Sequence, residues 1–289
     1  MLKPFHLLEP TTLAEAASQL DGEQTKVYAG GAELILLLRH GLVEAETLIN
    51  IKRISALNDL AWDGHSLNIG ATVTHRRLET DPLVRRYLPM LAEAESHIGN
   101  IRVRGQGTLG GNLCFADPHA DPATALLVHQ ARVGLAGKKE SRELPMEEFL
   151  VGMYETALRP DELLSEVKVP PLPEGWRHAY LRIERFYRPT VNAAAAGKVS
   201  GGRIEAVRLA VGCVGPKAQR LHELEGRLSG LRLEEAQRVV LESRSYLKAE
   251  LQPIDDLLGS AAYKLHITGV LLKKALGQML QEGGESNRG

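Results

Sequence analysis

Two glycine pairs in polar segments carry the most chemical information in this chain of 289 residues. They occur in Ala29-Gly30-Gly31-Ala32-Glu33 and in Gly107-Thr108-Leu109-Gly110-Gly111-Asn112. Glycine has no side chain to shield the backbone amides, and it reaches the positive φ that turns successive N–H groups inward around an anion. We therefore expect both segments to offer free N–H groups to the pyrophosphate of a large ligand.

The residues around the first pair predict a small parallel α/β unit. A strand over 26–29 runs into the pair, a helix over 33–40 ends at Gly41, and the next strand covers 48–51. A strand, a crossover helix and a strand imply parallel pairing. The glycine loop then lies at a helix N-terminus, where the helix dipole also favours anions.

From about residue 56 the pattern changes and predicts a second subdomain. We expect an antiparallel hairpin over 57–69, helices over 74–88 and 89–98, a helix that Asp121 caps and Pro122 begins, and strands over 132–136 and 163–169. The segment from Gly107 to Asn112 is expected to be a loop.

The proline-rich segment 170–175 breaks both helix and sheet, so it predicts a linker to a third region. The expected elements there are strands over 179–183, 191–199 and 204–214 and helices near 233–247 and 261–279. One face of the last helix carries an apolar stripe, which indicates core or subunit contact: Leu265, Leu272, Leu276 and Met279. The boundaries that follow are 1–55, 56–175 and 176–289.

Composition excludes several classes of function. A net charge of -1 and an aromatic content of 4% give no basic excess and few stacking platforms for nucleic acid. No apolar run is long enough for a membrane span, and the first residues lack the apolar stretch of an export signal, so we expect a cytoplasmic protein. The two cysteines, Cys114 and Cys213, are too few to hold an iron–sulfur cluster, so any redox metal must lie on another chain.

Three other motifs leave alternatives open. The run from Gly105 to Gly110 spells the dinucleotide fingerprint G-x-G-x-x-G, but it lies outside an early βαβ unit and continues into a polar loop, so a Rossmann site is not expected. The segment 117–121 contains two aspartates and a histidine without a completing metal ligand, and it is either a turn or a holder of ribose hydroxyls. Arg182, Arg185 and Arg188 around Phe186-Tyr187 form either a charged strand edge or one side of a site for a ring system.

Together these motifs closely resemble the FAD-binding medium subunit of molybdenum hydroxylases, and the nearest branch is that of aerobic carbon monoxide dehydrogenase. The resemblance covers essentially the whole chain and is carried by Ala29-Gly30-Gly31, by Ile98-Gly99-Asn100-Ile101-Arg102, by 107–113, by 116–123 and by 206–216. It implies an α+β fold with a vanillyl-alcohol-oxidase-type (PCMH-type) FAD-binding domain. FAD would lie between the subdomains 1–55 and 56–175, and the part 176–289 would add a three-stranded antiparallel sheet with helices.

The resemblance also implies the cofactor-binding residues, with no catalytic or metal-ligating residue on this chain. The set, to which we add Tyr187 from the arginine segment, is Val27, Tyr28, Ala29, Gly30, Gly31, Ala32, Glu33, Leu34, Ile98, Thr108, Leu109, Gly110, Gly111, Asn112, Asp121, Leu164, Arg182 and Tyr187. Of these, Asp121 would hold a ribose hydroxyl, and Arg182 stands where a relative carries lysine. Ala32 stands where many relatives have a hydroxyl residue, so backbone donors would carry the phosphate.

By resemblance, the partners are a large subunit with a molybdenum cofactor and a small subunit with two [2Fe–2S] clusters, in a dimer of heterotrimers. This oxidoreductase subunit would pass electrons from the clusters through FAD to an external acceptor. Two alternatives belong to other classes: a flavoenzyme of the same fold that acts alone, and a cofactor-binding scaffold without electron transfer.

Overall fold

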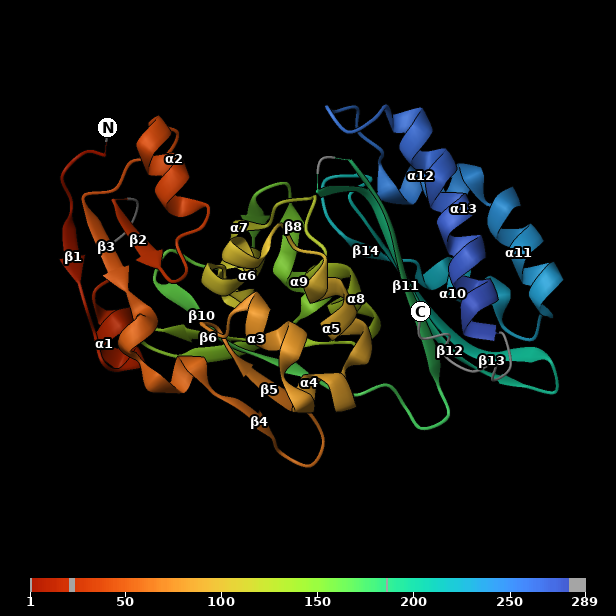
Figure 1. The fold of residues 1–289 in the computed structure, drawn as a ribbon, viewed down its shortest axis with the longest axis horizontal. Helices are drawn as coiled ribbons and strands as arrows, with labels where there is room; N and C mark the ends of the chain where they lie inside the picture. Colours follow the sequence, from red (N-terminus) through yellow and green to blue (C-terminus); the bar gives the residue numbers. More distant parts are fainter. Residues whose placement is uncertain (1, 21–23, 186, 281–289) are drawn as a thin grey trace.

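The computed structural model describes residues 2–20, 24–185 and 187–280, and its fold is α+β. Figure 1 shows three sheets that follow one another along the long axis of the molecule, in the order of the sequence. The sequence also predicts a turn at Asp21-Gly22 and a frayed end over 283–289, and both lie outside the described residues, as does Phe186 of the arginine segment.

The first sheet is entirely parallel, with the strand order β1-β3-β2. Its elements are β1 (His6–Leu8), α1 (Leu13–Ser18), β2 (Thr25–Tyr28), α2 (Leu34–His40) and β3 (Thr47–Asn50). The predicted parallel unit is therefore confirmed, and α2 ends at Gly41 with a φ of 70° as expected. The sequence did not predict β1, because two of its three residues are exposed and it has no apolar alternation.

The second sheet is antiparallel, with the order β4-β5-β10-β6-β7. Its strands are β4 (Leu60–Trp62), β5 (Leu67–Gly70), β6 (Arg132–Gly137), β7 (Ser141–Pro145) and β10 (Glu162–Val169), and a separate hairpin joins β8 (Leu150–Gly152) and β9 (Glu155–Thr156). The hairpin and the strands near 132 and 163 are confirmed.

Helices cover this second sheet, and one predicted helix is divided. The helical elements are the 3-10 turns η1 (Ile51–Arg53) and η2 (Ser55–Asn58) and the helices α3 (His75–Thr80), α4 (Pro82–Tyr87), α5 (Pro89–Ser96), α6 (Ile101–Gln106), α7 (Leu109–Phe115), α8 (Pro122–Val128) and α9 (Met146–Phe149). The single helix expected over 74–88 is wrong, because Pro82 cannot continue α3. A new helix begins there instead, and the Asp81 carboxylate accepts a hydrogen bond of 2.9 Å from the Leu83 amide.

The third sheet has the order β11-β12-β13-β14 and is antiparallel. Its elements are β11 (Arg177–Arg185), β12 (Arg188–Ser200), β13 (Arg203–Gly212), β14 (Gln219–Arg220), α10 (His222–Leu228), α11 (Leu233–Glu242), α12 (Arg244–Leu251) and α13 (Ala261–Leu280). The three predicted strands are confirmed, but the short β14 makes the sheet four-stranded. The helix expected over 233–247 is broken at Ser243, whose hydroxyl donates to the Val239 carbonyl at 2.7 Å.

Both faces of the third sheet are covered. Along β12, Ala194 and Ala196 pack into the core shared with the first two sheets, whereas Ala193 and Ala195 pack into the core under the C-terminal helices. Alternation along a strand explains this division, and the small side chains let both layers come close. Figure 1 shows α13 and α11 on one side of this sheet and α8 on the other.

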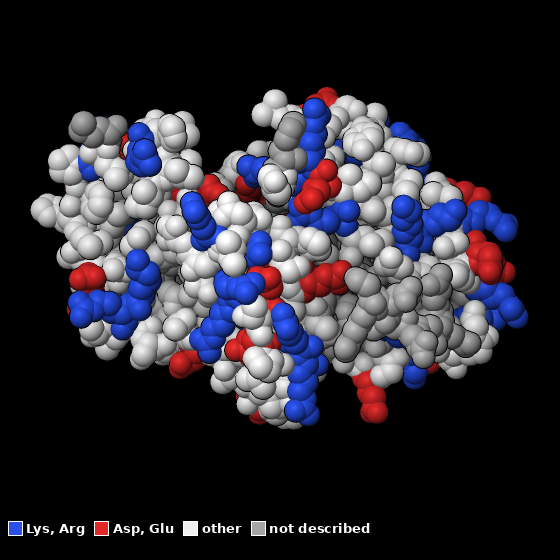
Figure 2. All heavy atoms as spheres, viewed as in Figure 1, with Lys and Arg blue, Asp and Glu red and all other residues white. Residues whose placement is uncertain are grey.

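The outer surface carries charges of both signs without a dominant patch on the face shown in Figure 2. That view is hollowed into a notch between the part that carries α2 and the rest of the molecule. None of the helices in the described ranges is long and apolar enough to cross a membrane.

The predicted apolar stripe of α13 is confirmed as core, since Leu265, Leu272, Leu276 and Met279 are all buried. We expect Leu272→Ala to lower the free energy of unfolding by about 3 kcal/mol, because it leaves a cavity in a close-packed layer. Leu257, which is 94% exposed, is the control, and Leu257→Ala should change the free energy of unfolding by less than about 0.5 kcal/mol. Urea unfolding measures both, and equal effects would contradict the assignment of the stripe to the core.

Candidate functional site

The two glycine segments, distant in sequence, touch each other. A Cβ built on Gly30 would overlap the Gln106 carbonyl oxygen and lie 3.0 Å from the Gly107 Cα. The Gln106 side-chain amide also donates to the Gly30 carbonyl at 3.0 Å. Only glycine fits at position 30, and the contact places the loop after β2 against the segment between α6 and α7.

In the first segment the backbone amides are free, as expected. The N–H groups of Gly30, Gly31, Ala32 and Glu33 donate to no acceptor in the described part of the chain. Gly31 has a φ of +74°, and a Cβ there would overlap the ring of Tyr28. Four successive amides without partners, on a turn that needs glycine, can hold an anion.

A basic residue that the sequence analysis missed lies beside this loop. The Lys52 ammonium lies 4.3 Å from the centroid of the Tyr28 ring and 3.2 Å from its hydroxyl. Because the Tyr28 ring packs on Gly31, the ammonium adds positive charge close to the free amides. Its position just after β3, the neighbour of β2 in a parallel sheet, was the signal that could have identified it.

The second segment is not a loop with free amides. Thr108 caps α7, whose first residues include the glycine pair, so the expected loop is wrong. The Gly107 amide donates to Val103 O at 2.7 Å, and the Leu109 and Gly110 amides donate to Val73 O and Ala71 O, both at 3.0 Å. The Gly111 amide donates to Thr108 Oγ1 at 3.1 Å and the Asn112 amide to Thr108 O at 2.9 Å. These contacts occupy five of the six amides that the sequence appeared to offer, and within the described ranges only the Thr108 amide is left without an acceptor. The run from Gly105 does open a helix after all, but that helix follows α6 instead of a strand, so it forms no βαβ unit.

The glycines of α7 have different reasons to be glycine. A Cβ on Gly110 would lie 2.7 Å from the Ala71 carbonyl oxygen, so the chain's own packing requires it. Gly111 is exposed, and a Cβ there would meet only Thr108 Oγ1, at 2.9 Å, among the described residues. Packing within the chain explains Gly110, and it leaves an open surface at Gly111.

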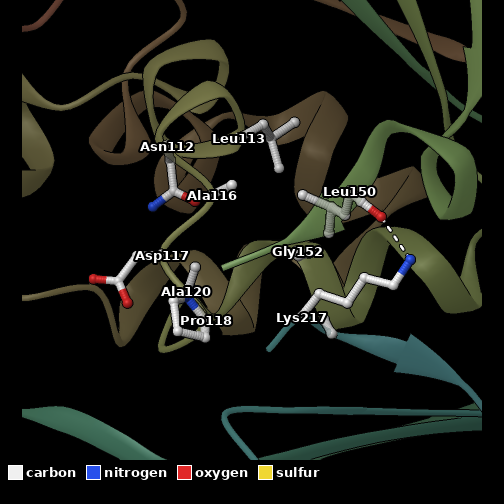
Figure 3. Close-up of a pocket in the computed structure, with 11 residues that line it drawn as sticks. Asn112, Leu113, Ala116, Asp117, Pro118, Ala120, Leu150, Gly152 and Lys217 are labelled. Atoms are coloured by element: carbon white, nitrogen blue, oxygen red, sulfur yellow. Dashed lines mark hydrogen bonds between the residues drawn. The ribbon is translucent and has the colours of Figure 1, made fainter. Parts of the chain in front are cut away.

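Asn112 adds polar atoms beside this surface. Its Oδ1 is buried and has no hydrogen-bond partner among the described residues. Figure 3 shows Asn112 and Asp117 on one side of a small cleft, with Leu113, Leu150 and Lys217 on the other. The Lys217 ammonium donates to the Leu150 carbonyl at 2.6 Å. The side-chain amide of Asn112 is therefore a polar group at this edge of α7 whose oxygen has no hydrogen-bond partner among the described residues.

Asp121 lies in a buried network instead of capping α8. Its Oδ1 accepts hydrogen bonds from the Tyr180 hydroxyl at 2.6 Å and from Asn192 Nδ2 at 3.3 Å, and its Oδ2 accepts from Arg182 at 2.8 Å. No side-chain cap bond forms, so the predicted capping role is wrong. Both oxygens are occupied, and the ribose contact expected of Asp121 stays a prediction. Burial raises the pKa of Asp121, and the Arg182 guanidinium opposes that rise.

Arg182 connects β11 to the segment that carries Ile98. It donates to the His97 carbonyl at 3.0 Å and pairs with Asp121 and Glu184. Its side chain is only 6% exposed, and its Nε has no partner within the described ranges. A solvated strand edge would not bury a guanidinium, so the geometry argues against the charged-edge interpretation for Arg182, and its place beside a ring system stays a prediction.

The remaining predicted residues lie apart from this cluster or beneath it. Tyr187 is 78% exposed at the tip of the β11–β12 hairpin, and Leu164 is buried in β10. Arg188 pairs with Asp117, whose carboxylate also accepts from the His119 amide at 2.9 Å, as expected for a turn. Among residues 2–20, 24–185 and 187–280, no group of three or more His, Cys, Asp or Glu side chains is placed to hold a metal ion.

The chain is similar to proteins of one family over nearly its whole length. The family model described as the FAD binding domain in molybdopterin dehydrogenase matches residues 3–172, and that of the CO dehydrogenase flavoprotein C-terminal domain matches residues 188–279. The carbon monoxide dehydrogenase medium chain of Hydrogenophaga pseudoflava is 31% identical, over 96% of this chain and 97% of that one. A putative xanthine dehydrogenase FAD-binding subunit of Escherichia coli is 29% identical, over 94% and 95%.

Solved structures agree with these similarities. A chain of the carbon monoxide dehydrogenase from Hydrogenophaga pseudoflava superposes with a TM-score of 0.91 at 31% identity, covering 96% of this chain and 98% of that one. A chain of quinoline 2-oxidoreductase from Pseudomonas putida 86 gives a TM-score of 0.89 at 27% identity, covering 97% and 98%.

The buried pair gives a prediction with a defined pH dependence. Arg182→Leu leaves the Asp121 carboxylate buried without its counter-ion and should lower the free energy of unfolding by about 3 kcal/mol at neutral pH. Without the guanidinium the pKa of Asp121 rises further, so the carboxyl takes up a proton more readily and the loss should shrink as the pH falls toward 5.

Urea unfolding of the variant and the wild type at both pH values measures this effect. Arg238, exposed on α11, is the matched control, and Arg238→Leu should stay within about 0.5 kcal/mol. If the loss of unfolding free energy stayed constant or grew on acidification, the cost of burying the Asp121 carboxylate would not depend on Arg182.

Proposed function

We propose that this chain is the subunit through which electrons leave its complex, because it belongs to the FAD-binding medium subunits of the molybdenum hydroxylases, the family of carbon monoxide dehydrogenase and xanthine dehydrogenase. It is an FAD-binding oxidoreductase subunit. In the proposal, a large subunit oxidises the substrate at a molybdenum cofactor and a small subunit carries the electrons over two [2Fe–2S] clusters. The complex is a dimer of such heterotrimers in the cytoplasm.

The residues present fit an FAD. The observation that carries the proposal is the row of free amides from Gly30 to Glu33, which begins where Gly30 contacts Gln106 and Gly107, just before α7. These amides would hold the pyrophosphate, with Lys52 adding positive charge. On the other side, the Asn112 side-chain amide is an uncommitted polar group, and the missing side chain at Gly111 leaves room for a ligand.

The rest of the proposed site would be provided by the buried network. The Arg182 Nε–H has no partner among the residues described and would donate to an acceptor on the ligand near Ile98. FAD, when bound, supplies the exchange of electrons between one-electron carriers and a two-electron acceptor. The chain's own residues then need only bind and orient it and keep water from its buried side.

The cysteines support the placement of the clusters on another chain. Burial raises the pKa of the Cys114 thiol to about 12, and it raises that of Cys213 well above its ordinary value. A [2Fe–2S] cluster held by cysteines needs four of them, twice the number in this chain. With these two as its only cysteines, the chain depends on a partner for its source of electrons.

The first test is a cofactor analysis of the complex purified with its partners. We expect flavin on this chain and iron and molybdenum on the other subunits, measured by absorption and metal analysis after the subunits are separated. Flavin with turnover of a small substrate by the isolated chain would instead support a flavoenzyme that acts alone. A folded, partner-bound chain without flavin would support a scaffold.

The second test addresses the glycine pair of α7. Gly111→Val places a branched side chain on the open surface, and we expect the purified protein to lose its flavin while it stays folded. Gly105→Val is the matched control, because Gly105 is also an exposed helical glycine and a Cβ there meets nothing within 4 Å. The measurement is the flavin absorbance per folded chain.

In the control the flavin content should equal that of the wild type. Circular dichroism shows whether each variant folds. A folded Gly111→Val protein with full flavin content would contradict the placement of the ligand over α7.

A further inference from the structure

A buried histidine and a buried glutamate lie directly beneath the contact between the two glycine segments. His75 is the first residue of α3, and its Nδ1 lies 2.6 Å from Oε2 of Glu95 in α5. The two side chains are 4% and 0% exposed. Neither belongs to the motifs by which the sequence predicts cofactor binding.

The imidazole of His75 supports Gly107. A Cβ built on Gly107 would lie 3.0 Å from His75 Cδ2 and 3.4 Å from Nε2, so the ring occupies the space that a side chain at 107 would need. The His75 amide also donates to the Gly107 carbonyl at 3.1 Å. The backbone at Gly107 is therefore fixed by both the main chain and the side chain of His75.

On its other side, Gly107 meets the first glycine loop. A Cβ on Gly30 would lie 3.0 Å from the Gly107 Cα. The four residues Glu95, His75, Gly107 and Gly30 thus form a continuous stack that runs from the core to the loop of free amides.

Packing alone does not explain the polar pair. Glu95 is fully buried, its Oε1 has no partner in the described part of the chain, and burial raises its pKa against the opposing effect of His75. An apolar pair of the same volume would fill this space without the cost of burying polar groups. What a hydrogen bond adds is a fixed orientation of the imidazole ring, and that orientation determines the ring's contact with Gly107.

We propose that His75, oriented by Glu95, is a positioning residue for the cofactor: it holds Gly107 against Gly30 and so keeps the amides of Gly30 to Glu33 turned toward the pyrophosphate. The inference rests on the proposed binding of FAD. His75 itself touches the loop and does not need to touch the ligand.

The test compares His75→Asn with His129→Asn. Asparagine keeps a donor near the position of Nδ1, so the carboxyl at 95 keeps a partner, but it removes the part of the ring that contacts Gly107. His129 is a matched control, because it is also fully buried and its imidazole makes one hydrogen bond to the described residues, from Nδ1 to the Pro170 carbonyl at 2.9 Å. The readouts are the FAD dissociation constant of the apoprotein and the hydrogen exchange of the Leu109 and Gly110 amides without FAD.

We expect His75→Asn to weaken FAD binding by about tenfold or more, as removal of the residues that orient metal ligands does for metal affinity. It should also speed exchange at Leu109 and Gly110, whose amides bond to the segment just before His75. His129→Asn should change neither. Wild-type affinity in folded His75→Asn, or an equal loss in the His129 variant, would overturn the proposal.

A second pair of variants separates orientation from folding. Glu95→Gln keeps an acceptor for the His75 ring and should retain FAD affinity within about threefold, whereas Glu95→Leu removes the acceptor and should lose it as His75→Asn does. Equal FAD affinity in Glu95→Gln and Glu95→Leu would overturn the proposal that Glu95 orients His75. If the wild-type apoprotein bound no FAD, the proposed function would fail instead, and the exchange rates would still decide whether His75 positions the segment.

Discussion

The close approach of two backbones, at Gly30 and Gly107, is the constraint on which the proposed site depends. At this distance neither segment tolerates an intervening side chain, and the chain meets the requirement with glycine on one side and a carbonyl on the other. The parallel sheet β1-β3-β2 presents the first loop, and the segment before α3 supports the second. The parts of the chain that carry the first and second sheets are therefore held in position against each other through main-chain atoms, whose positions vary less than those of side chains.

The two glycine segments differ in how their backbone amides are used. In the described part of the chain the first keeps four amides without partners. The second commits every amide except that of Thr108, to acceptors on Val103, Val73, Ala71 and Thr108. A site built only from free amides would leave many polar groups unsatisfied before the cofactor arrives. Here that cost is restricted to one short turn and the Thr108 amide, and the other amides of the second segment are satisfied without a ligand.

Local patterns in the sequence were enough to predict much of the fold. The unit around Gly30, the hairpin near Asp63 and the strands of the third sheet follow from apolar alternation and from glycine and proline positions, which act over a few residues. The helix at Gly110-Gly111 was missed because glycine disfavours a helix, and what forms this one is the cap at Thr108 and the bond from Gly110 N to Ala71 O.

The parts of the site that sequence could not predict depend on contacts between distant segments. Asp121 has the position and type of a helix cap, but Tyr180, Arg182 and Asn192, which are 59 to 71 residues further along the chain, compete for its oxygens. His75 and Glu95 are likewise ordinary helical residues until the fold brings them together beneath Gly107. The free amides at Gly30 were predictable because the turn that exposes them is local.

The alanines of β12 have a mechanical consequence. Because they are packed on both faces, the third sheet lies close to α8, and Thr124 of that helix reaches Asn192 of the strand at 2.8 Å. Two parts joined over a close-packed apolar layer are not expected to swing apart as rigid bodies, since relative domain motion needs a smaller or wetter interface. We therefore expect the C-terminal sheet to move together with α8, as a fixed wall beside the buried network around Asp121.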